Sequence, residues 1–98
     1  NEMEESKVEN YLLELEQDDY NLVELGRCGT LKEIDELIEK FLKETNFKSY
    51  YQRSREMDKK IWIDYGSHVC FLYISRLDGE KLTLEEYRKE TRDEEGEI

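Results

Sequence analysis

The stretch Lys60-Ile-Trp-Ile-Asp-Tyr-Gly-Ser-His-Val-Cys-Phe-Leu-Tyr-Ile-Ser-Arg76 predicts two neighbouring β-strands in a sheet. Residues 60–65 alternate in polarity, and the side chains that share one face are Ile61, Ile63 and Tyr65. Residues 68–76 are apolar at both odd and even positions, which is typical of a central strand. Gly66-Ser67 separates the two runs with turn-forming residues. The stretch therefore predicts a hairpin at the centre of the sheet.

Two further strands are expected outside this hairpin. Residues 50–57 alternate loosely, and Asp58-Lys59 provides a turn into the strand that follows, which completes a three-strand meander. Residues 20–25 form a short apolar-rich run that ends at Gly26.

Three segments begin with the capping-box pattern, in which Ser or Thr precedes Glu by three residues. The pairs are Ser6 with Glu9, Thr30 with Glu33, and Thr83 with Glu86. The second pair opens an apolar stripe at helical spacing that runs from Leu31 to Leu42. The first precedes a narrower stripe made of Val8, Tyr11, Leu12 and Leu15. We therefore predict a helix after each of the three caps, the last of them the weakest in apolar content.

These elements predict an α+β fold in the order α-β-α-β-β-β-α. The expected sheet has three to four strands, is mainly antiparallel, and carries the helices on one face. Residues 1–92 are expected to form a single domain, and residues 93–98 a frayed acidic tail.

Composition excludes several classes of protein. The 98 residues carry 26 acidic and 15 basic side chains, for a net charge of −11, so binding to nucleic acid through the global field is disfavoured. No apolar run is long enough to span a membrane, and no export signal is visible. Two cysteines cannot build a disulfide framework, so a reducing cytoplasm is the expected location. We expect no membrane contact and no direct contact with nucleic acid.

The acidic residues are concentrated near the amino end. Residues 1–20 contain eight acids and one base, whereas residues 46–65 contain three acids and five bases. On a helix from Glu4 to Asp19, seven carboxylates would extend over about 24 Å, with a mean spacing close to that of phosphates along a nucleic-acid strand. Tyrosine and tryptophan add contacts of the kind found at interface hot spots. The predicted partner-binding residues are Glu5, Glu9, Glu14, Glu16, Asp18, Asp19, Tyr50, Tyr51 and Trp62.

The small size, the net charge and the acid clusters at Glu2–Asp19 and Glu85–Glu97 carry a resemblance at the level of a class. The chain resembles the small acidic inhibitors of phages and mobile elements, the anti-CRISPR and anti-restriction proteins that mimic DNA. It also resembles, more loosely, the acidic immunity proteins of basic toxins. The resemblance implies an inhibitor that occupies the cationic cleft of a CRISPR nuclease or restriction enzyme in the host cytoplasm, without cofactor or turnover.

Two other hypotheses come from the middle of the chain. The segment 48–60 combines cations with an aromatic residue and could bind single-stranded nucleic acid, an acidic partner or a second copy of the chain, or could simply protect a sheet edge with charge. Asp64, His68 and Cys70 lie within seven residues, a spacing that would suit a small nucleophilic site. Structural roles are favoured for these three residues. Metal binding by Cys28, His68 and Cys70 is expected even less, because no pair has the spacing of a zinc site. The chain is therefore not expected to be an enzyme or to hold a metal.

Overall fold

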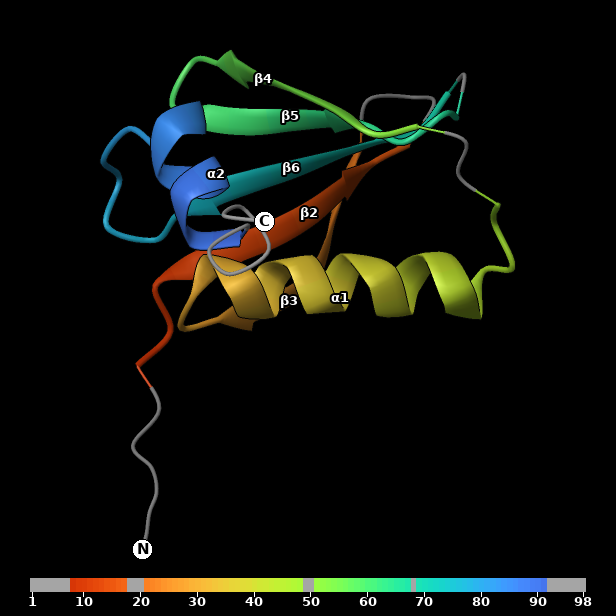
Figure 1. The fold of residues 1–98 in the computed structure, drawn as a ribbon, viewed down its shortest axis with the longest axis horizontal. Helices are drawn as coiled ribbons and strands as arrows, with labels where there is room; N and C mark the ends of the chain where they lie inside the picture. The colour runs from red at the N-terminus through yellow and green to blue at the C-terminus, as the bar shows by residue number, and fades with distance from the viewer. Residues whose placement is uncertain (1–7, 18–20, 49–50, 68, 92–98) are drawn as a thin grey trace, which may run out of the picture.

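A five-stranded antiparallel sheet with two helices forms the computed structural model (Figure 1). The structure describes residues 8–17, 21–48, 51–67 and 69–91. The elements in chain order are β2 (Tyr11–Glu16), β3 (Leu22–Cys28), α1 (Leu31–Glu44), β4 (Arg53–Met57), β5 (Lys60–Asp64), β6 (Phe71–Arg76) and α2 (Leu84–Thr91). The strand order is β3-β2-β6-β5-β4, with β6 at the centre. The expected α+β class, the meander and the central position of its last strand are confirmed.

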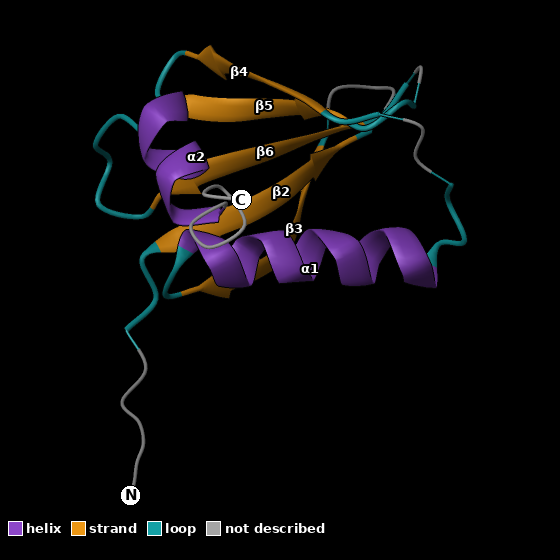
Figure 2. Cartoon of the chain, viewed as in Figure 1, coloured by secondary structure: helices purple, strands orange, loops and turns teal. Residues whose placement is uncertain are grey.

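Both helices lie on the same side of the sheet (Figure 2). Helix α1 begins at the predicted capping box: Thr30 Oγ1 accepts from the Glu33 amide at 3.1 Å, and Glu33 Oε1 accepts from the Thr30 amide at 3.2 Å. Helix α2 begins similarly, with the Glu86 amide donating to Thr83 Oγ1 at 3.1 Å. The predicted helices at these two caps are confirmed. Neither described helix is long and apolar enough to cross a membrane.

The helix predicted from the first capping box is wrong over residues 11–16, which form strand β2. The sequence Tyr-Leu-Leu-Glu-Leu-Glu fits a period of 3.6 and a period of 2 almost equally well. Pairing decides between them, because β2 lies between β3 and β6 and forms ladders with both. The observed order within the described residues is β-β-α-β-β-β-α, so the sheet has five strands where three to four were expected.

Strand β3 also differs from its prediction, because it continues through Gly26 to Cys28. A β-bulge interrupts the register opposite Leu13 and Glu14. Glycine is required here by close packing: a Cβ on Gly26 would lie 2.6 Å from Leu37 Cδ2 of α1. The residue read as a strand terminator is therefore a point at which α1 packs closely on the sheet.

The core lies between the helices and the sheet face beneath them, which we call the closed face. Its strand residues, all buried, are Tyr11, Leu13, Leu15, Ile61, Ile63, Leu72 and Ile74. Leu31, Ile34 and Ile38 of α1 and Tyr87 of α2 close this layer from above. Because side chains alternate along a strand, the residues between these positions point to the opposite side. None of the described helices covers that side (Figures 1 and 2).

Candidate interaction face

The uncovered side of the sheet, which we call the open face, brings together polar and aromatic side chains from all five strands. Its residues are Leu12, Glu14, Glu16, Leu22, Glu24, Arg27, Arg53, Arg55, Met57, Lys60, Trp62, Asp64, Phe71, Tyr73 and Ser75. Directly opposed residues of paired strands point to the same side, which fixes this list from the register. The open face is therefore a surface to which all five strands contribute and that the core does not use.

One straight row crosses the open face from edge to edge. Pairing places Glu24 opposite Glu14, Glu14 opposite Tyr73, Tyr73 opposite Trp62, and Trp62 opposite Arg55. The row thus begins with two carboxylates, passes through two aromatic rings and ends with a guanidinium group. We call it the central row. Its charge changes sign across the width of the sheet.

The aromatic centre of the open face is held by stacking. The Trp62 and Phe71 rings lie 5.1 Å apart between centroids at an interplanar angle of 33°. The Arg55 guanidinium lies 4.9 Å from the Trp62 ring centroid, and that of Arg53 lies 4.8 Å from the Tyr51 centroid. Such cation–π contacts are worth about 0.5–1 kcal/mol at exposed sites. They orient two arginines at the β4 edge without neutralising them.

The carboxylates of β2 are tied to neighbouring strands. Lys60 Nζ lies 3.4 Å from Glu14 Oε1, and the Glu14 side chain is only 17% exposed. The Tyr73 hydroxyl donates to Glu16 Oε1 at 2.6 Å. Burial, followed by the Glu16 carboxylate, raises the pKa of Tyr73 to about 12. Glu24, at the β3 edge, is more exposed and pairs with Arg27 at 3.1 Å.

A shallow groove of about 280 Å³ runs over Tyr73 on the open face. Glu16 and Lys60 line it together with two apolar side chains, Leu22 and Met57. These two are 44% and 41% exposed, although residues of their type are usually buried. The groove therefore adds exposed apolar surface beside the charged row.

The structure brings together three of the predicted partner-binding residues: Glu14, Glu16 and Trp62 share the open face. Tyr51 lies beside it under Arg53 and is 45% exposed. Glu9 lies elsewhere, at the other end of β2. The remaining predicted residues, Glu5, Asp18, Asp19 and Tyr50, lie outside the described residues. The predicted helical array of carboxylates is wrong for Glu14 and Glu16, which are neighbours on a strand face.

Sequence reasoning missed Glu24, Phe71 and Tyr73 as members of this face. The signal was present in β6, where alternate residues could have been assigned to two different surfaces, but the run was interpreted as buried on both sides. Glu24 could be placed only after β2 was recognised as a strand, since the row depends on the register between β2 and β3.

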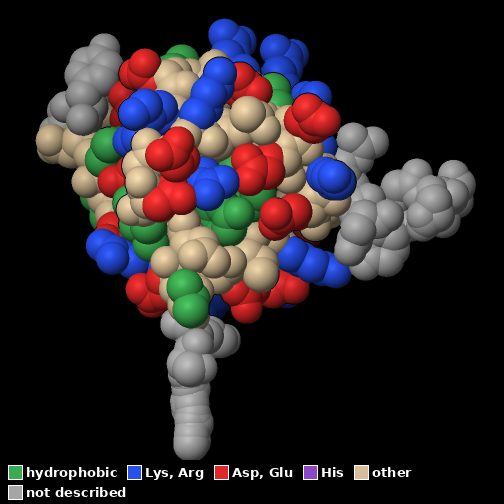
Figure 3. Space-filling view, turned by 90° about the vertical axis from the view of Figure 1, so that its left-hand side faces the viewer, with side chains coloured by type: hydrophobic (Ala, Val, Ile, Leu, Met, Phe, Trp, Pro, Cys, Tyr) green, Lys and Arg blue, Asp and Glu red, His purple; other side chains and the backbone are tan. Residues whose placement is uncertain are grey.

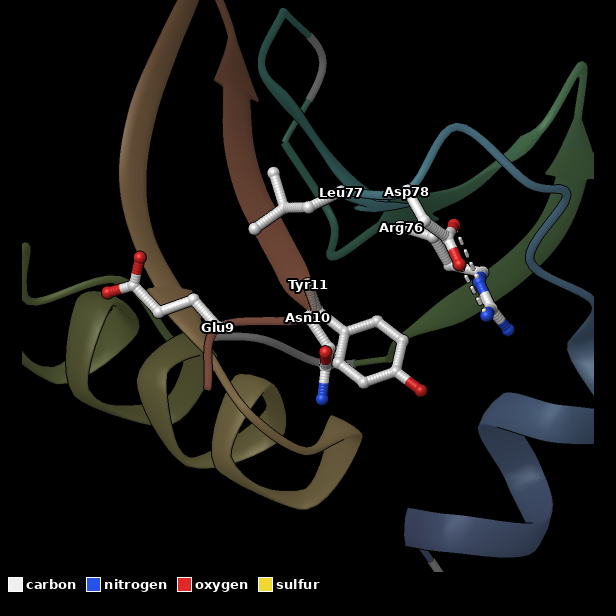
Figure 4. A pocket seen from close by; sticks show the side chains of 6 residues that line it. All are labelled: Glu9, Asn10, Tyr11, Arg76, Leu77 and Asp78. Carbon is white, nitrogen blue, oxygen red and sulfur yellow. Dashed lines mark hydrogen bonds and ion pairs between the residues drawn. The ribbon is translucent and has the colours of Figure 1, made fainter. Parts of the chain in front are cut away.

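Glu9 belongs to a polar pocket of about 440 Å³ at the Arg76 end of the sheet (Figure 4). Arg76 contacts Asp78 through two bonds of 2.8 and 3.1 Å and contacts Glu86 of α2 at 2.9 Å. The hydrogen bonds from Arg76 hold the pKa of Asp78 at about 2. Figure 3 shows acidic and basic side chains interspersed over this end of the molecule. Arg76 thus bridges the carboxylates of Asp78 and Glu86, and its bond to Glu86 links α2 to strand β6.

The residues considered for catalysis have local partners. Asp64 Oδ1 accepts from the Gly66 amide at 3.0 Å, and the Cys70 amide donates to Ser67 Oγ at 3.0 Å. His68 lies outside the described residues. Cys28 lies opposite Tyr11, and Cys70 lies one residue beyond the position opposite Glu16, so the two cysteines are offset by roughly 20 Å along β2. The described residues contain no group of three or more His, Cys, Asp or Glu side chains that could hold a metal ion.

Comparison with known proteins gives no match: no family model, no curated protein and no solved structure is similar to this chain. The open face is therefore interpreted from its own chemistry.

Proposed function

We propose that this chain is a non-catalytic binding protein that uses the open face to bind a cationic surface of another protein. The central row is the observation that supports the proposal. It places Tyr73, Trp62 and Arg55, the residue types most frequent at interface hot spots, beside the carboxylates of β2 and β3 on a surface that no described helix covers.

Long-range charge favours a basic partner. The net charge of −11 attracts a cationic protein before contact, and Glu14, Glu16 and Glu24 supply carboxylates at the contact itself. A nucleic-acid-handling protein, such as a CRISPR nuclease or a restriction enzyme, presents such a surface in its cleft. Occupation of that cleft would make this chain an inhibitor, and occupation of a basic toxin would make it an immunity protein.

A second candidate function is the binding of single-stranded nucleic acid by the β4 edge. The stacking of Arg53 on Tyr51 and of Arg55 on Trp62 favours it, because cations beside aromatic rings suit phosphates and bases. However, the Arg55 guanidinium already covers the Trp62 ring, and the carboxylates of β2 lie on the same face, three strands from β4. Phosphate would be repelled from half of the open face, so we favour the protein partner.

The test compares capture from a lysate of the source organism by the wild type and two charge-reversed variants. Glu24→Lys changes the open face, and Glu44→Lys makes the same change at an exposed position of α1, on the other side of the sheet. A basic protein that is retained by the wild type and Glu44→Lys, lost with Glu24→Lys and weakened by salt would support the proposal.

Equal capture of the basic protein by Glu24→Lys and Glu44→Lys would contradict the proposal that the open face is the binding surface. A parallel measurement follows the fluorescence anisotropy of labelled oligothymidylate and oligouridylate. Binding that disappears in Arg55→Glu would establish the second candidate in place of the first.

A further inference from the structure

We infer that the open face binds the open face of a second copy of this chain, forming a two-fold symmetric dimer. The inference concerns the same surface as the proposed function and adds self-association as its regulation. It rests on the central row, whose first and last residues carry opposite charges; the ion pair of Glu24 with Arg27 is 45–48% exposed, and Arg55 of a second copy would compete with Arg27 for this carboxylate.

The central row is complementary to itself. When two open faces meet with their rows running in opposite directions, Arg55 of each copy lies over Glu24 of the other. Tyr73 then lies over Tyr73 on the axis, and Trp62 of each copy lies over Glu14 of the other, so the two faces would exclude water from the rings. Self-complementary patches of this kind are the signature of an isologous interface, in which each contact occurs twice.

Charge also selects the orientation of the dimer axis. An axis parallel to the strands reverses the row and brings each arginine over a glutamate. An axis perpendicular to the strands within the interface would place Arg55 over Arg55 and Glu24 over Glu24, which is repulsive at both ends. Face-to-face sheets pack with their strands nearly aligned, and both arrangements satisfy that preference, so charge decides between them.

The area available predicts a weak, reversible dimer. Five strands spaced about 4.8 Å apart and roughly 18 Å long would bury on the order of 1,000 Å² over both copies. This value is at the lower end for specific interfaces, where dissociation constants in the micromolar range are common. Leu22 and Met57, exposed at the rim of the groove, would be partly covered in the dimer.

Self-association would regulate the proposed function, because a dimer occupies the surface that the target needs. A cationic group of the target would replace Arg55 of the second copy over Glu24. The monomer would then be the active form, and at high protein concentration most of the protein would be an inactive dimer.

The test is a charge swap followed by sedimentation velocity across micromolar to millimolar chain concentrations. Arg55→Glu and Glu24→Arg should each weaken the dimer about 100-fold, since each variant places like charges at both symmetric contacts. An equimolar mixture of the two variants should recover wild-type affinity, because the heterodimer has opposite charges at both contacts. Glu44→Arg, with the same charge change as Glu24→Arg, is the matched control and should behave as the wild type.

The emission of Trp62, the single tryptophan, supplies a second readout and should shift to shorter wavelength on dimerisation. A wild-type chain that is monomeric at millimolar concentration would overturn the inference. A dimer that persists in both variants would also overturn it, as would variants that remain monomeric when mixed. None of these results depends on a target, so the dimer can fail while capture of a basic protein succeeds, and the reverse.

Discussion

The two faces of the sheet are made from the same strands but differ in every physical respect. On β5, Ile61 and Ile63 are fully buried on the closed face, whereas Trp62 between them is partly exposed on the open face. The closed face is apolar and is filled by residues of α1 and α2. The open face carries ion pairs, stacked rings and exposed apolar side chains. The closed face thus forms the core of the fold, and the open face is the surface that we propose for binding.

The largest effect should come from truncating neighbouring residues of β5 in turn. Ile63→Ala should lower the free energy of unfolding by about 3 kcal/mol, because it leaves a cavity in the core. Trp62→Ala should cost about 1 kcal/mol, since the ring contacts Phe71 and Arg55 on an uncovered surface. Urea denaturation followed by circular dichroism measures both. Equal losses would mean that the open face is part of the folding core.

A second contrast lies on β3, at Gly26 and Glu24. Gly26→Ala should cost about 1–2 kcal/mol, because its Cβ forces Leu37 of α1 to move. Glu24→Ala should stay within about 0.5 kcal/mol, as expected for an exposed position. The same denaturation experiment applies, with Leu37→Ala as the background that should abolish the cost of Gly26→Ala. A cost that survives in that background would show that packing against α1 is not the reason for glycine.

The closed face was easier to predict from sequence than the open face, for a physical reason. A capping box and an apolar stripe are local, so Thr30 with Glu33 predicted α1 correctly. The turn at Asp58 was also predicted, and there Asp58 adopts φ 59°, a conformation that aspartate tolerates.

Strand β2 could not be recognised locally, because its periodicity is ambiguous and its second partner, β6, begins at residue 71. The central row depends on that pairing. Glu14 lies opposite Tyr73, which continues the row to Trp62 and Arg55. This alignment depends on the pairing of distant strands and cannot be read from any one segment of the sequence. The site residues found from sequence, Glu14, Glu16 and Trp62, were chosen by type, and the fold supplied their arrangement.

A smaller effect tests whether the open face contributes to stability through its ion pair. Lys60 and Glu14 are 35% and 17% exposed, and their atoms are 3.4 Å apart. A double-mutant cycle with Glu14→Gln and Lys60→Met should give a coupling of about 0.5 kcal/mol, because the pair is partly solvated. Raising the salt concentration should reduce the coupling. A coupling near 3 kcal/mol would indicate a buried pair, and the two faces would then differ less than the exposures indicate.

The smallest effect concerns tyrosine titration on the two faces. Burial raises the pKa of Tyr87 of α2, which donates to Asp35 of α1 at 2.7 Å on the helical side of the sheet. Burial together with Glu16 raises the pKa of Tyr73 to about 12 on the open face. A tyrosine whose pKa is raised in the folded state makes its full contribution to the free energy of unfolding below its ordinary pKa of 10.0. This contribution is lost as the pH rises from 10.0 through the pKa of the folded state. Stability should therefore fall between about pH 10 and pH 12.

The two tyrosines can be separated by ¹³C NMR of their Cζ atoms during a pH titration. Glu16→Gln should lower the pKa of Tyr73 while leaving it above 10.0, because burial, the first cause of the rise, remains when the carboxylate is removed. Glu24→Gln, a matched change elsewhere on the open face, should leave it unchanged. Tyr87 should respond to neither variant, since its partner is Asp35 on the other side of the sheet. A Tyr73 pKa that stays at about 12 in Glu16→Gln would mean that the hydroxyl is held by desolvation alone, and the open face would then be drier than its uncovered position implies.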